Sequence, residues 1–356
     1  MGRHVTAVVL MLLAGVVMAW SEDQPPAALT TVNMHSTGPE RIGNLPPVMV
    51  PANNPQAPDK ILLGKMLYFD TRLSKDNTIS CATCHNPAMG WSDAGPTSAG
   101  IGGQHGGRRS PPVVNAAHSS LQFWDGRAPN LEEQAKGPIQ NPIEMGNTHD
   151  AMLRTVNDIP GYVEVFKKVF GSSPITVDQV AQAIAAYERT IVTTDSPFDR
   201  FVRGDQSALT AEEKRGLEIF NGKGHCTACH WGGYLSDGRF HNLGVAPAAG
   251  KTPDEGRYAV TKNPVDSGKF KTPTVRDAAR RAPYMHNGSE LDLEAVVALY
   301  NRGGGTADGR LDPLMVPLGL TRQEERALVA FMKHALNSTN PEVADEQPLS
   351  PAQLPK

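Results

Sequence analysis

The sequence predicts a mainly α-helical protein made of two similar domains that are joined by long, ordered loops. Apolar residues recur at helical spacing along much of the 356-residue chain, whereas few runs alternate as β-strands do. One short motif of cysteines and a histidine occurs twice, each time after a helical segment with a glycine and an aromatic residue. Glycine and proline are frequent, at 34 and 29 residues, which indicates long connections between the helices.

The N-terminus has the composition of a secretory signal peptide. A short positive region precedes an apolar run from Val5 to Val17, and the small Ala19 follows. The run is shorter than the ~20 residues of a comfortable membrane span, so we expect cleavage and no stable membrane insertion. A retained anchor is the alternative. Residues 1–19 are thus interpreted as a signal peptide for the periplasm, and the proline-rich residues 20–57 as an extended leader.

The remaining chain divides into two domains and a tail. We place the N-terminal domain at residues 58–205, the C-terminal domain at 206–340 and a disordered tail at 341–356. Thr210 and Glu213 form a capping-box pattern that starts the first helix of the second domain. Helical patterns also cover residues 148–170, 176–193, 197–203, 292–301 and 321–337. Residues 86–130 and 231–283 show no clear period and are predicted to be loops.

All four cysteines belong to two C-x-x-C-H motifs, Cys81–Cys84–His85 and Cys226–Cys229–His230. Two disulfides or a zinc ion bound by four cysteines are the alternatives in an exported chain. However, a histidine directly after each pair is the attachment pattern of c-type haem. We therefore predict two covalent c-type haems, one in each of two cytochrome c-like domains. The adjacent histidines, His85 and His230, are the expected proximal ligands of the two irons.

The chain resembles the bacterial di-haem cytochrome c peroxidase and MauG family over about residues 58–340. The resemblance rests on the two motifs and on "FWDGRAPNLEEQA", "NPIEM", "FKTPTVRDA" and "APYMHNGS". It implies that Trp124 lies between the haems and carries electrons or holes. It also implies that Glu144 is a general acid/base over the first haem, in a pocket lined by Gln134 and Pro138. A carboxylate suits that role, because cleavage of peroxide requires a group that accepts and returns a proton.

The resemblance also bears on the open face of the first haem. Classical members of the family carry a distal histidine sixteen residues after the proximal one, and this chain has Ile101 there. We therefore expect an open, five-coordinate, high-spin iron at His85. The alternative is His105, four residues further on, as a switchable ligand.

Tyr300 is the residue on which the functional interpretation depends. In "DLEAVVALYNRGG" it shares one helix face with Leu293 and Val297, so it either fills a core or binds an iron. Classical members of the family place a methionine fourteen residues after the histidine equivalent to His286, and MauG-like members place a tyrosine. We expect the phenolate of Tyr300 to bind the second haem iron, with Met285 as the rival ligand. An anionic, hard ligand favours higher oxidation states of iron.

These features predict a peroxide-dependent oxidoreductase. The leading hypothesis is a periplasmic enzyme that uses hydrogen peroxide to form a high-valent, bis-Fe(IV)-type state and oxidises residues, foremost tryptophan, of a partner protein. The alternatives are a peroxidase that takes electrons from a small cytochrome or cupredoxin, and a plain electron carrier. MauG uses a surface tryptophan as a relay where this chain has Gly224, which favours an MbnH-like branch with a different partner.

Calcium is left open. Calcium-binding members of the family have an asparagine at the position of Arg109, whose guanidinium could take the cation's place. The backbone carbonyls that would join it come from Arg281 and Pro283. The net charge is only -3 and no basic stripe is present, so a nucleic-acid partner is not expected.

Overall fold

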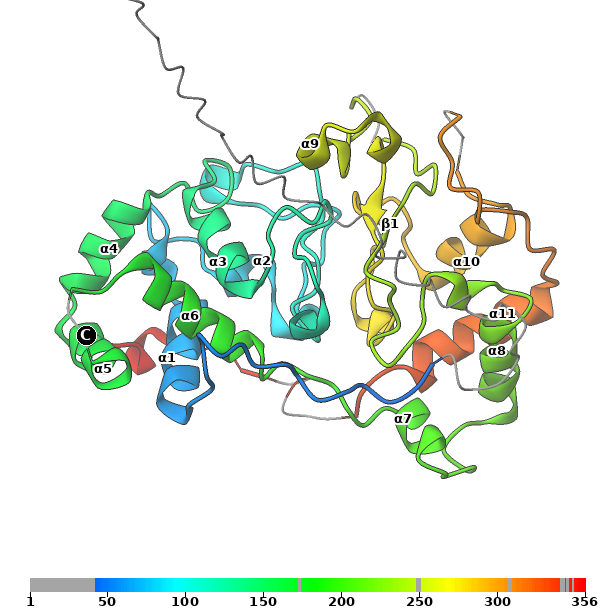
Figure 1. Cartoon of the computed structure of the whole chain (residues 1–356), viewed down its shortest axis with the longest axis horizontal. Helices are drawn as coiled ribbons and strands as arrows, with labels where there is room; N and C mark the ends of the chain where they lie inside the picture. The colour runs from blue at the N-terminus through cyan, green and yellow to red at the C-terminus, as the bar shows by residue number, and fades with distance from the viewer. Residues whose placement is uncertain are drawn as a thin grey trace, which may run out of the picture. The chain divides into compact units, whose positions relative to one another are not determined.

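The structure is a computed structural model of the chain (Figure 1). It describes residues 42–171, 174–247, 251–305, 309–339, 343, 346–347 and 349–356. The predicted signal peptide and residues 20–41 of the leader lie outside the described residues. Within the described ranges, no helix is long and apolar enough to cross a membrane.

The first domain is framed by α-helices that pack around an aromatic and aliphatic core. They are α1 (Pro58–Phe69), α3 (Leu131–Gln140), α4 (His149–Asn157), α5 (Pro160–Phe170) and α6 (Val177–Glu188). Helix α1 lies against α6, which also contacts α3 (Figure 1). A Cβ atom on Gly64 would stand 1.9 Å from the carbonyl oxygen of Ala183, so only glycine permits this close approach of α1 to α6.

The second domain contains a similar pair of closely packed helices. Its helices are α8 (Ala211–Asn221), α10 (Leu293–Asn301) and α11 (Arg322–Ala330), which continues as a π-helical turn, Phe331–Ala335. A Cβ atom on Gly216 of α8 would stand 2.1 Å from the carbonyl oxygen of Ala327 in α11. The same glycine contact therefore joins the paired helices of both domains. The predicted capping box of Thr210 and Glu213 is confirmed at the start of α8.

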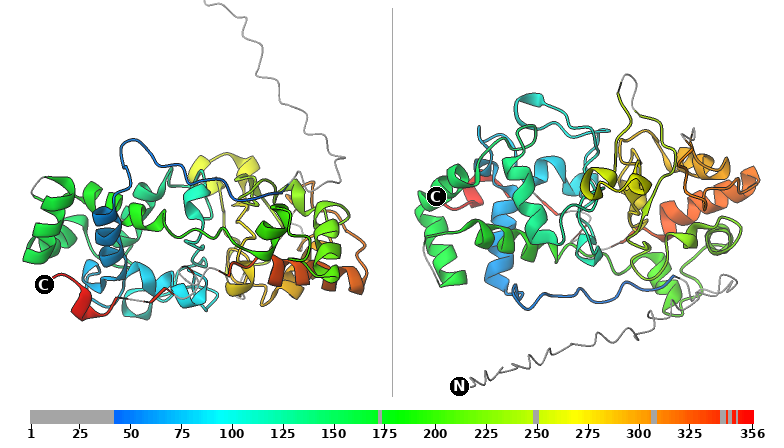
Figure 2. Two further views of the ribbon diagram at one scale, coloured as in Figure 1. Left: turned by 90° about the horizontal axis from the view of Figure 1, so that it is seen from below. Right: turned by 45° about the horizontal axis from the view of Figure 1, so that its top comes forward.

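Long connections with short regular pieces complete the fold (Figure 2). They contain α2 (Cys81–Cys84), α7 (Pro197–Val202), α9 (Tyr258–Thr261) and the strands β1 (Phe240–His241) and β2 (Phe270–Lys271). The two strands pair antiparallel, with Phe240 opposite Lys271. Short 3₁₀ turns span Thr71–Leu73, Pro87–Met89, Ile101–Gly103, Ala116–His118, Cys226–Ala228, Pro264–Asp266, Ala278–Arg280 and Pro351–Gln353. The predicted mainly helical class with long loops is confirmed.

Two element predictions are corrected. The single helix expected over residues 148–170 is two helices, because Pro160 lacks an N–H group and begins α5 at its first position. Helix α3 falls in a segment that was not predicted to be helical. Its start is set by Asn130, whose side chain accepts a hydrogen bond from the N–H of Glu133.

The described parts of the leader and tail pack against the domains. Ile42 forms a bridge with Gly232 and is buried in the core of the second domain. The prediction of a disordered tail is wrong for the described residues. Val343 is buried in the first core, and its carbonyl oxygen accepts a hydrogen bond from Trp91 Nε1 at 2.8 Å. The carbonyl oxygen of Lys356 accepts one from Gly161 at 2.9 Å.

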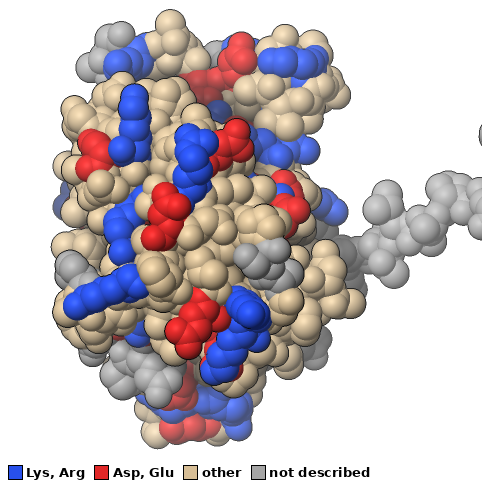
Figure 3. Space-filling model, turned by 90° about the vertical axis from the view of Figure 1, so that its left-hand side faces the viewer, with Lys and Arg blue, Asp and Glu red and all other residues tan. Residues whose placement is uncertain are grey.

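Charged side chains of both signs are interspersed on the face that Figure 3 presents. Ion pairs such as Lys168–Asp59, at 2.9 Å, join residues on the surface of the first domain. This face therefore carries no broad area of a single charge.

Candidate functional site

The first C-x-x-C-H motif forms α2, and its histidine follows at the C-terminal end. Ser80 caps the helix in a reciprocal box with Thr83. Nδ1 of His85 lies 2.9 Å from the carbonyl oxygen of Pro111, so it donates a proton there and leaves the Nε2 lone pair for a metal. Burial lowers the pKa of His85 to about 4, which keeps the ring neutral. This is the form of imidazole that binds iron.

The second motif has the same design. Nδ1 of His230 lies 3.0 Å from the carbonyl oxygen of Leu235, and burial lowers the pKa of the ring. All four cysteines are free thiols, which excludes disulfides in this structure. Among the described residues, the one group of three possible metal ligands is Cys229, Asp237 and His241, so a four-cysteine zinc cluster is absent. Both motifs therefore fit covalent haem, with thiols for the vinyl groups and an oriented imidazole for the iron.

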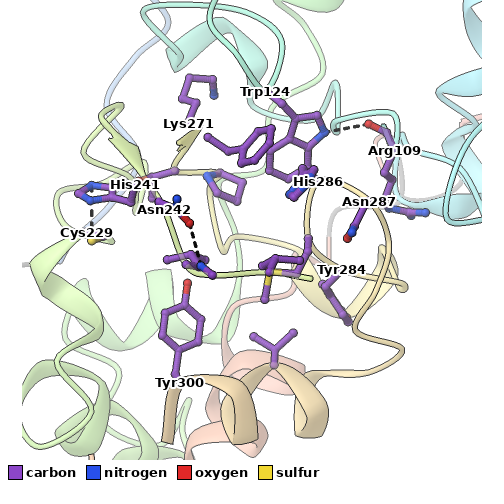
Figure 4. Close-up of a pocket in the computed structure, with 18 of the residues that line it drawn as sticks. Arg109, Trp124, Cys229, His241, Asn242, Lys271, Tyr284, His286, Asn287 and Tyr300 are labelled. Atoms are coloured by element: carbon purple, nitrogen blue, oxygen red, sulfur yellow. Dashed lines mark hydrogen bonds between the residues drawn. The ribbon is translucent and has the colours of Figure 1, made fainter. Parts of the chain in front are cut away.

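A cavity of about 790 Å³ lies beside the second motif (Figure 4). Its wall includes Cys226, Cys229, His230 and the α10 residues Leu293, Val296, Val297 and Tyr300. The helix face identified in the sequence thus lines a cavity as well as packing in the core. Asp292 caps α10 by accepting a hydrogen bond from the N–H of Ala295, which fixes the position of this face.

Tyr300 points its phenol oxygen into this cavity (Figure 4). Burial raises the pKa of the phenol, so Tyr300 is neutral without a cation nearby. A bound ferric ion would supply the positive charge that favours the phenolate. Met285 lines the same cavity, so the structure keeps it as the rival ligand.

Glu144 lies in the loop that follows α3, close to the first motif. Asn141 Nδ2 donates a hydrogen bond to Glu144 Oε1 at 2.7 Å, and the N–H of Ile101 donates to the Glu144 carbonyl oxygen at 2.8 Å. Burial raises the pKa of Glu144, against the opposing charge of Arg127 and the hydrogen bond from Asn141. Burial and the nearby Glu144 charge both raise the pKa of the Cys84 thiol, to about 11. The carboxyl group is therefore within electrostatic reach of this haem-attachment residue.

Gln134 and Pro138 lie one turn apart on α3 and share a helix face. Both side chains are partly buried. The carbonyl oxygen of Pro138 accepts a hydrogen bond from the N–H of Met145 at 3.2 Å, which ties α3 to the residue that follows Glu144. The structure thus connects the predicted pocket helix directly to the loop of the predicted acid/base.

Trp124 stands at the contact between the two domains. Its Nε1 donates a hydrogen bond to the carbonyl oxygen of Arg109 at 2.8 Å, and its own carbonyl oxygen accepts one from the N–H of Lys271 at 2.8 Å. Trp124 also lines the cavity near His286 (Figure 4). The ring of His286 stacks on Phe270 at a centroid distance of 3.7 Å. The position of Trp124 between the two haems stays a prediction.

The guanidinium of Arg109 occupies a cage of oxygens at the same contact. It is 4% exposed. It donates hydrogen bonds to the backbone carbonyls of Asp93, Gly95, Arg281 and Ala282. The sequence predicted that the carbonyls of Arg281 and Pro283 would face this cation position. The structure confirms Arg281 but places the carbonyl of Ala282, not that of Pro283, against Nη2. A calcium ion does not fit here while the guanidinium fills the cage.

The two residues considered as ligands on the open face of the first haem, Ile101 and His105, make other contacts. Ile101 packs against the first core, where its side chain lies beside Gly146. His105 is exposed, and its Nδ1 lies 3.1 Å from Thr97 Oγ1. His105 also lines the cavity beside the second motif, whose wall includes residues of both domains.

Three further residues at the site have no role predicted from the sequence. Trp231, directly after His230, is 50% exposed, and its place beside the motif could have drawn attention to it. Lys271 lines the cavity, and burial lowers the pKa of its amine to about 8. His241 lies between Asp237 at 3.0 Å and Asp312 at 2.6 Å. Asp237 is only four residues from His241, whereas Asp312 and Lys271 reach the site through tertiary contacts that no local pattern indicates.

The fold and the paired motifs define a mainly helical c-type cytochrome with a cavity beside its haem-attachment residues. The family described as di-haem cytochrome c peroxidase matches residues 58–207. Cytochrome-c peroxidase IdrP1 of Denitromonas iodatirespirans is 43% identical, over 86% of this chain and 89% of that protein. Methylamine utilization protein MauG of Methylorubrum extorquens is 42% identical, over 80% of each chain.

A solved structure agrees with these relatives. The crystal structure of a MauG-like protein associated with microbial copper homeostasis superposes with a TM-score of 0.79 at 29% identity, over 94% of this chain and 100% of that one. The chain belongs to the di-haem cytochrome c peroxidase family, which includes the MauG proteins. It is therefore an oxidoreductase of the peroxidase type with c-type haem as its cofactor.

Proposed function

We propose that this protein is a periplasmic di-haem enzyme that uses hydrogen peroxide to oxidise residues, foremost tryptophan, of a partner protein. Cys81 and Cys84 would attach one haem, with His85 on its iron. Cys226 and Cys229 would attach the other, with His230 on its iron. The observation that carries the proposal is the phenol of Tyr300, which points into the cavity beside the second motif.

The first site provides access and proton transfer for peroxide. When bound, the haem supplies the redox-active iron at which peroxide gains two electrons. His105 forms a hydrogen bond with Thr97 and lines the cavity beside the second motif, which supports a first haem iron without His105 as a ligand. Asn141 holds Oε1 of Glu144, so Oε2 is the oxygen that accepts the first peroxide proton and returns it to the leaving oxygen. The raised pKa of Glu144 brings proton exchange closer to neutral pH.

The ligand of the second haem iron would determine whether this haem stores an oxidising equivalent or accepts electrons from a donor protein. A methionine ligand raises the potential of a haem and suits an electron-accepting role, whereas a phenolate ligand stabilises ferric iron. Tyr300 in this position therefore favours a site that itself gives up an electron to the first site. Trp124 would couple the two, because it contacts Arg109 on one side and Lys271 on the other.

Contact with a partner protein would be made close to the second site. Trp231 exposes half of its surface directly after His230, and Gly224 lies on the cavity wall. An exposed indole next to the proximal ligand offers a short path from the second haem to the surface. The predicted export signal supports the periplasm as the location of this partner.

The second candidate function is removal of hydrogen peroxide with electrons from a small cytochrome or cupredoxin. It is favoured by the similarity to a cytochrome-c peroxidase at 43% identity and by Met285, which lines the cavity together with Tyr300. A thioether ligand at the second iron would suit this role.

Steady-state kinetics with reduced cytochrome c and peroxide separates the two functions. We expect the wild-type holoprotein to turn over slowly with this donor, and Tyr300→Met to turn over faster, because a methionine ligand makes the second site accept electrons more readily. Rapid turnover of the wild type, unchanged in Tyr300→Met, would contradict the proposal and support peroxide removal. If the wild type turns over slowly, mass spectrometry of periplasmic proteins treated with enzyme and peroxide should identify the oxidised partner.

A further inference from the structure

The carbonyl cage around Arg109 joins the two domains. Nη1 donates to the carbonyl oxygen of Gly95, and Nη2 donates to that of Asp93. Both of these acceptors belong to the first domain. Nη2 also donates to the carbonyl oxygens of Arg281 at 3.1 Å and Ala282 at 3.2 Å, in the second domain. Carbonyls that are withdrawn from water need a donor or a cation. The buried guanidinium of Arg109 bonds all four carbonyls, of which that of Arg281 is in a buried hydrogen bond and the others are partly buried.

The chemistry of this cage is that of a cation site. Its four acceptors are neutral, hard oxygens, which are ligands that calcium accepts in proteins. A guanidinium satisfies them because it is permanently charged and presents five N–H donors in a planar fork. The neighbouring Arg108 differs, because its partners are the carboxylates of Asp125 and Asp254. Arg109 thus supplies charge to a cage that has no carboxylate among its hydrogen-bond partners.

The backbone around Arg109 contacts groups from both haem sites. Its N–H donates to the carbonyl oxygen of His286 at 2.7 Å, and its carbonyl oxygen accepts from Trp124 Nε1 at 2.8 Å. Two residues further on, the carbonyl oxygen of Pro111 accepts from His85 Nδ1 at 2.9 Å. Fixing the guanidinium therefore fixes a segment that orients both the predicted proximal ligand and the coupling tryptophan.

We infer that the guanidinium of Arg109 takes the place of a calcium ion between the domains and positions Trp124 and His85. The enzyme is then active without divalent metal, and it cannot be switched by removal of calcium. The effects of calcium and EGTA on stability and EPR spectra do not depend on the proposed function. Only the response of both haems to peroxide rests on it.

The first experiment uses the wild-type holoprotein. Metal analysis is expected to find no calcium per chain after gel filtration. Addition of calcium or of the chelator EGTA is expected to leave the thermal midpoint and the haem EPR spectrum unchanged. One tightly bound calcium per chain, with loss of either property on chelation, would overturn the inference.

The second experiment opens the cage. Arg109→Asn removes the guanidinium but keeps a side-chain oxygen, so the four carbonyls and water can bind calcium. We expect its Tm to fall by roughly 5 °C or more in EGTA and to recover in calcium. The high-spin EPR signal of the first haem should broaden and recover in parallel, because His85 loses and regains its orientation. Arg109→Leu should show the same loss of Tm and of the EPR signal, but calcium should not restore either, because leucine offers no oxygen to bind the ion.

Arg257→Asn is the matched control. Arg257 also joins the domains, through the carbonyls of Asp125 and Gly126, but its side chain is partly exposed. Its variant should lose some stability and show no response to calcium. Calcium recovery in this control, or wild-type stability and spectra in Arg109→Leu, would contradict the inference. If the calcium results hold while peroxide fails to act on both haems together, the proposed function fails and the inference stands.

Discussion

The indole nitrogen of Trp124 donates a hydrogen bond to the backbone carbonyl of Arg109 at 2.8 Å. This bond places an oxidisable aromatic ring at the contact between the domains, with the carbonyl oxygen of Trp124 held by Lys271 on the other side. Because Arg109 is itself held by four carbonyls from both domains, the orientation of the ring depends on the whole contact.

Trp124→Phe is expected to uncouple the two haem sites. Phenylalanine keeps a ring in place but loses the donor to Arg109 and is far harder to oxidise. Stopped-flow spectroscopy should show an unchanged first reaction with peroxide, while the change at the second haem becomes slow. Simultaneous change at both haems in the variant would mean that Trp124 is only a packing residue.

Glu144→Gln is expected to slow the reaction with peroxide by about 10²- to 10⁴-fold, because the amide cannot exchange a proton. The wild-type rate should rise as pH rises through the pKa of Glu144, since only the carboxylate accepts the peroxide proton. Burial raises this pKa, so the rise lies above the ordinary value of 4.5. The variant should show a flat profile over this range, and a retained pH-dependent rise would assign the proton transfer to another group.

Glu188 gives a separate prediction for stability. It is buried, Oε2 lacks a hydrogen-bond partner, and burial raises its pKa from 4.5 to about 8. The protonated form therefore stabilises the folded protein, fully below pH 4.5 and with loss as pH rises through 8. Glu188→Gln should be more stable than the wild type at pH 8, with the advantage vanishing near pH 4.5. Thermal unfolding at both pH values tests this, and a difference that is independent of pH would contradict it.

Trp231 is expected to carry oxidising equivalents to the surface. Spin trapping after addition of peroxide, followed by mass spectrometry, should find an adduct on Trp231 in the wild type. Trp231→Phe should lose the adduct while it reacts with peroxide at the normal rate. Trp91→Phe is the matched control, because Trp91 is buried in the first core and should leave the adduct on Trp231 unchanged. An adduct located elsewhere in the wild type would place the exit at another residue.

Local patterns predicted a large part of the fold. The glycines of the two repeated segments mark the close helix contacts at Gly64 and Gly216, and the capping box at Thr210 marks the start of α8. Such features act within one turn or one helix pair, so sequence alone displays them. The split at Pro160 was missed because the apolar period continues across the proline. The ordered tail was missed because its support is distant: Trp91 and Val343 are 252 residues apart.

The site was predictable to a similar extent. The motif residues and Tyr300 stand in recognisable spacing, and their roles in haem attachment and iron binding stay predictions. The structure adds that Nδ1 of each motif histidine is held by a backbone carbonyl and that Tyr300 lines the cavity. The cage around Arg109 could not be derived in detail, because its acceptors are backbone carbonyls of two separate segments. Gly95 is 14 residues from Arg109 in the sequence, whereas Arg281 is 172 residues away. Backbone carbonyls carry no residue type, so the replacement of Pro283 by Ala282 is visible only in three dimensions.

The role of Tyr300 is tested most directly by low-temperature EPR of the ferric holoprotein and of Tyr300→Phe. The account predicts one high-spin and one low-spin haem in the wild type, with the low-spin signal altered in the variant. Addition of peroxide to the wild type should remove both ferric signals together. Two low-spin haems that are unaffected by the substitution would contradict the account, because Tyr300 would then be a packing residue and the first iron would have no open face.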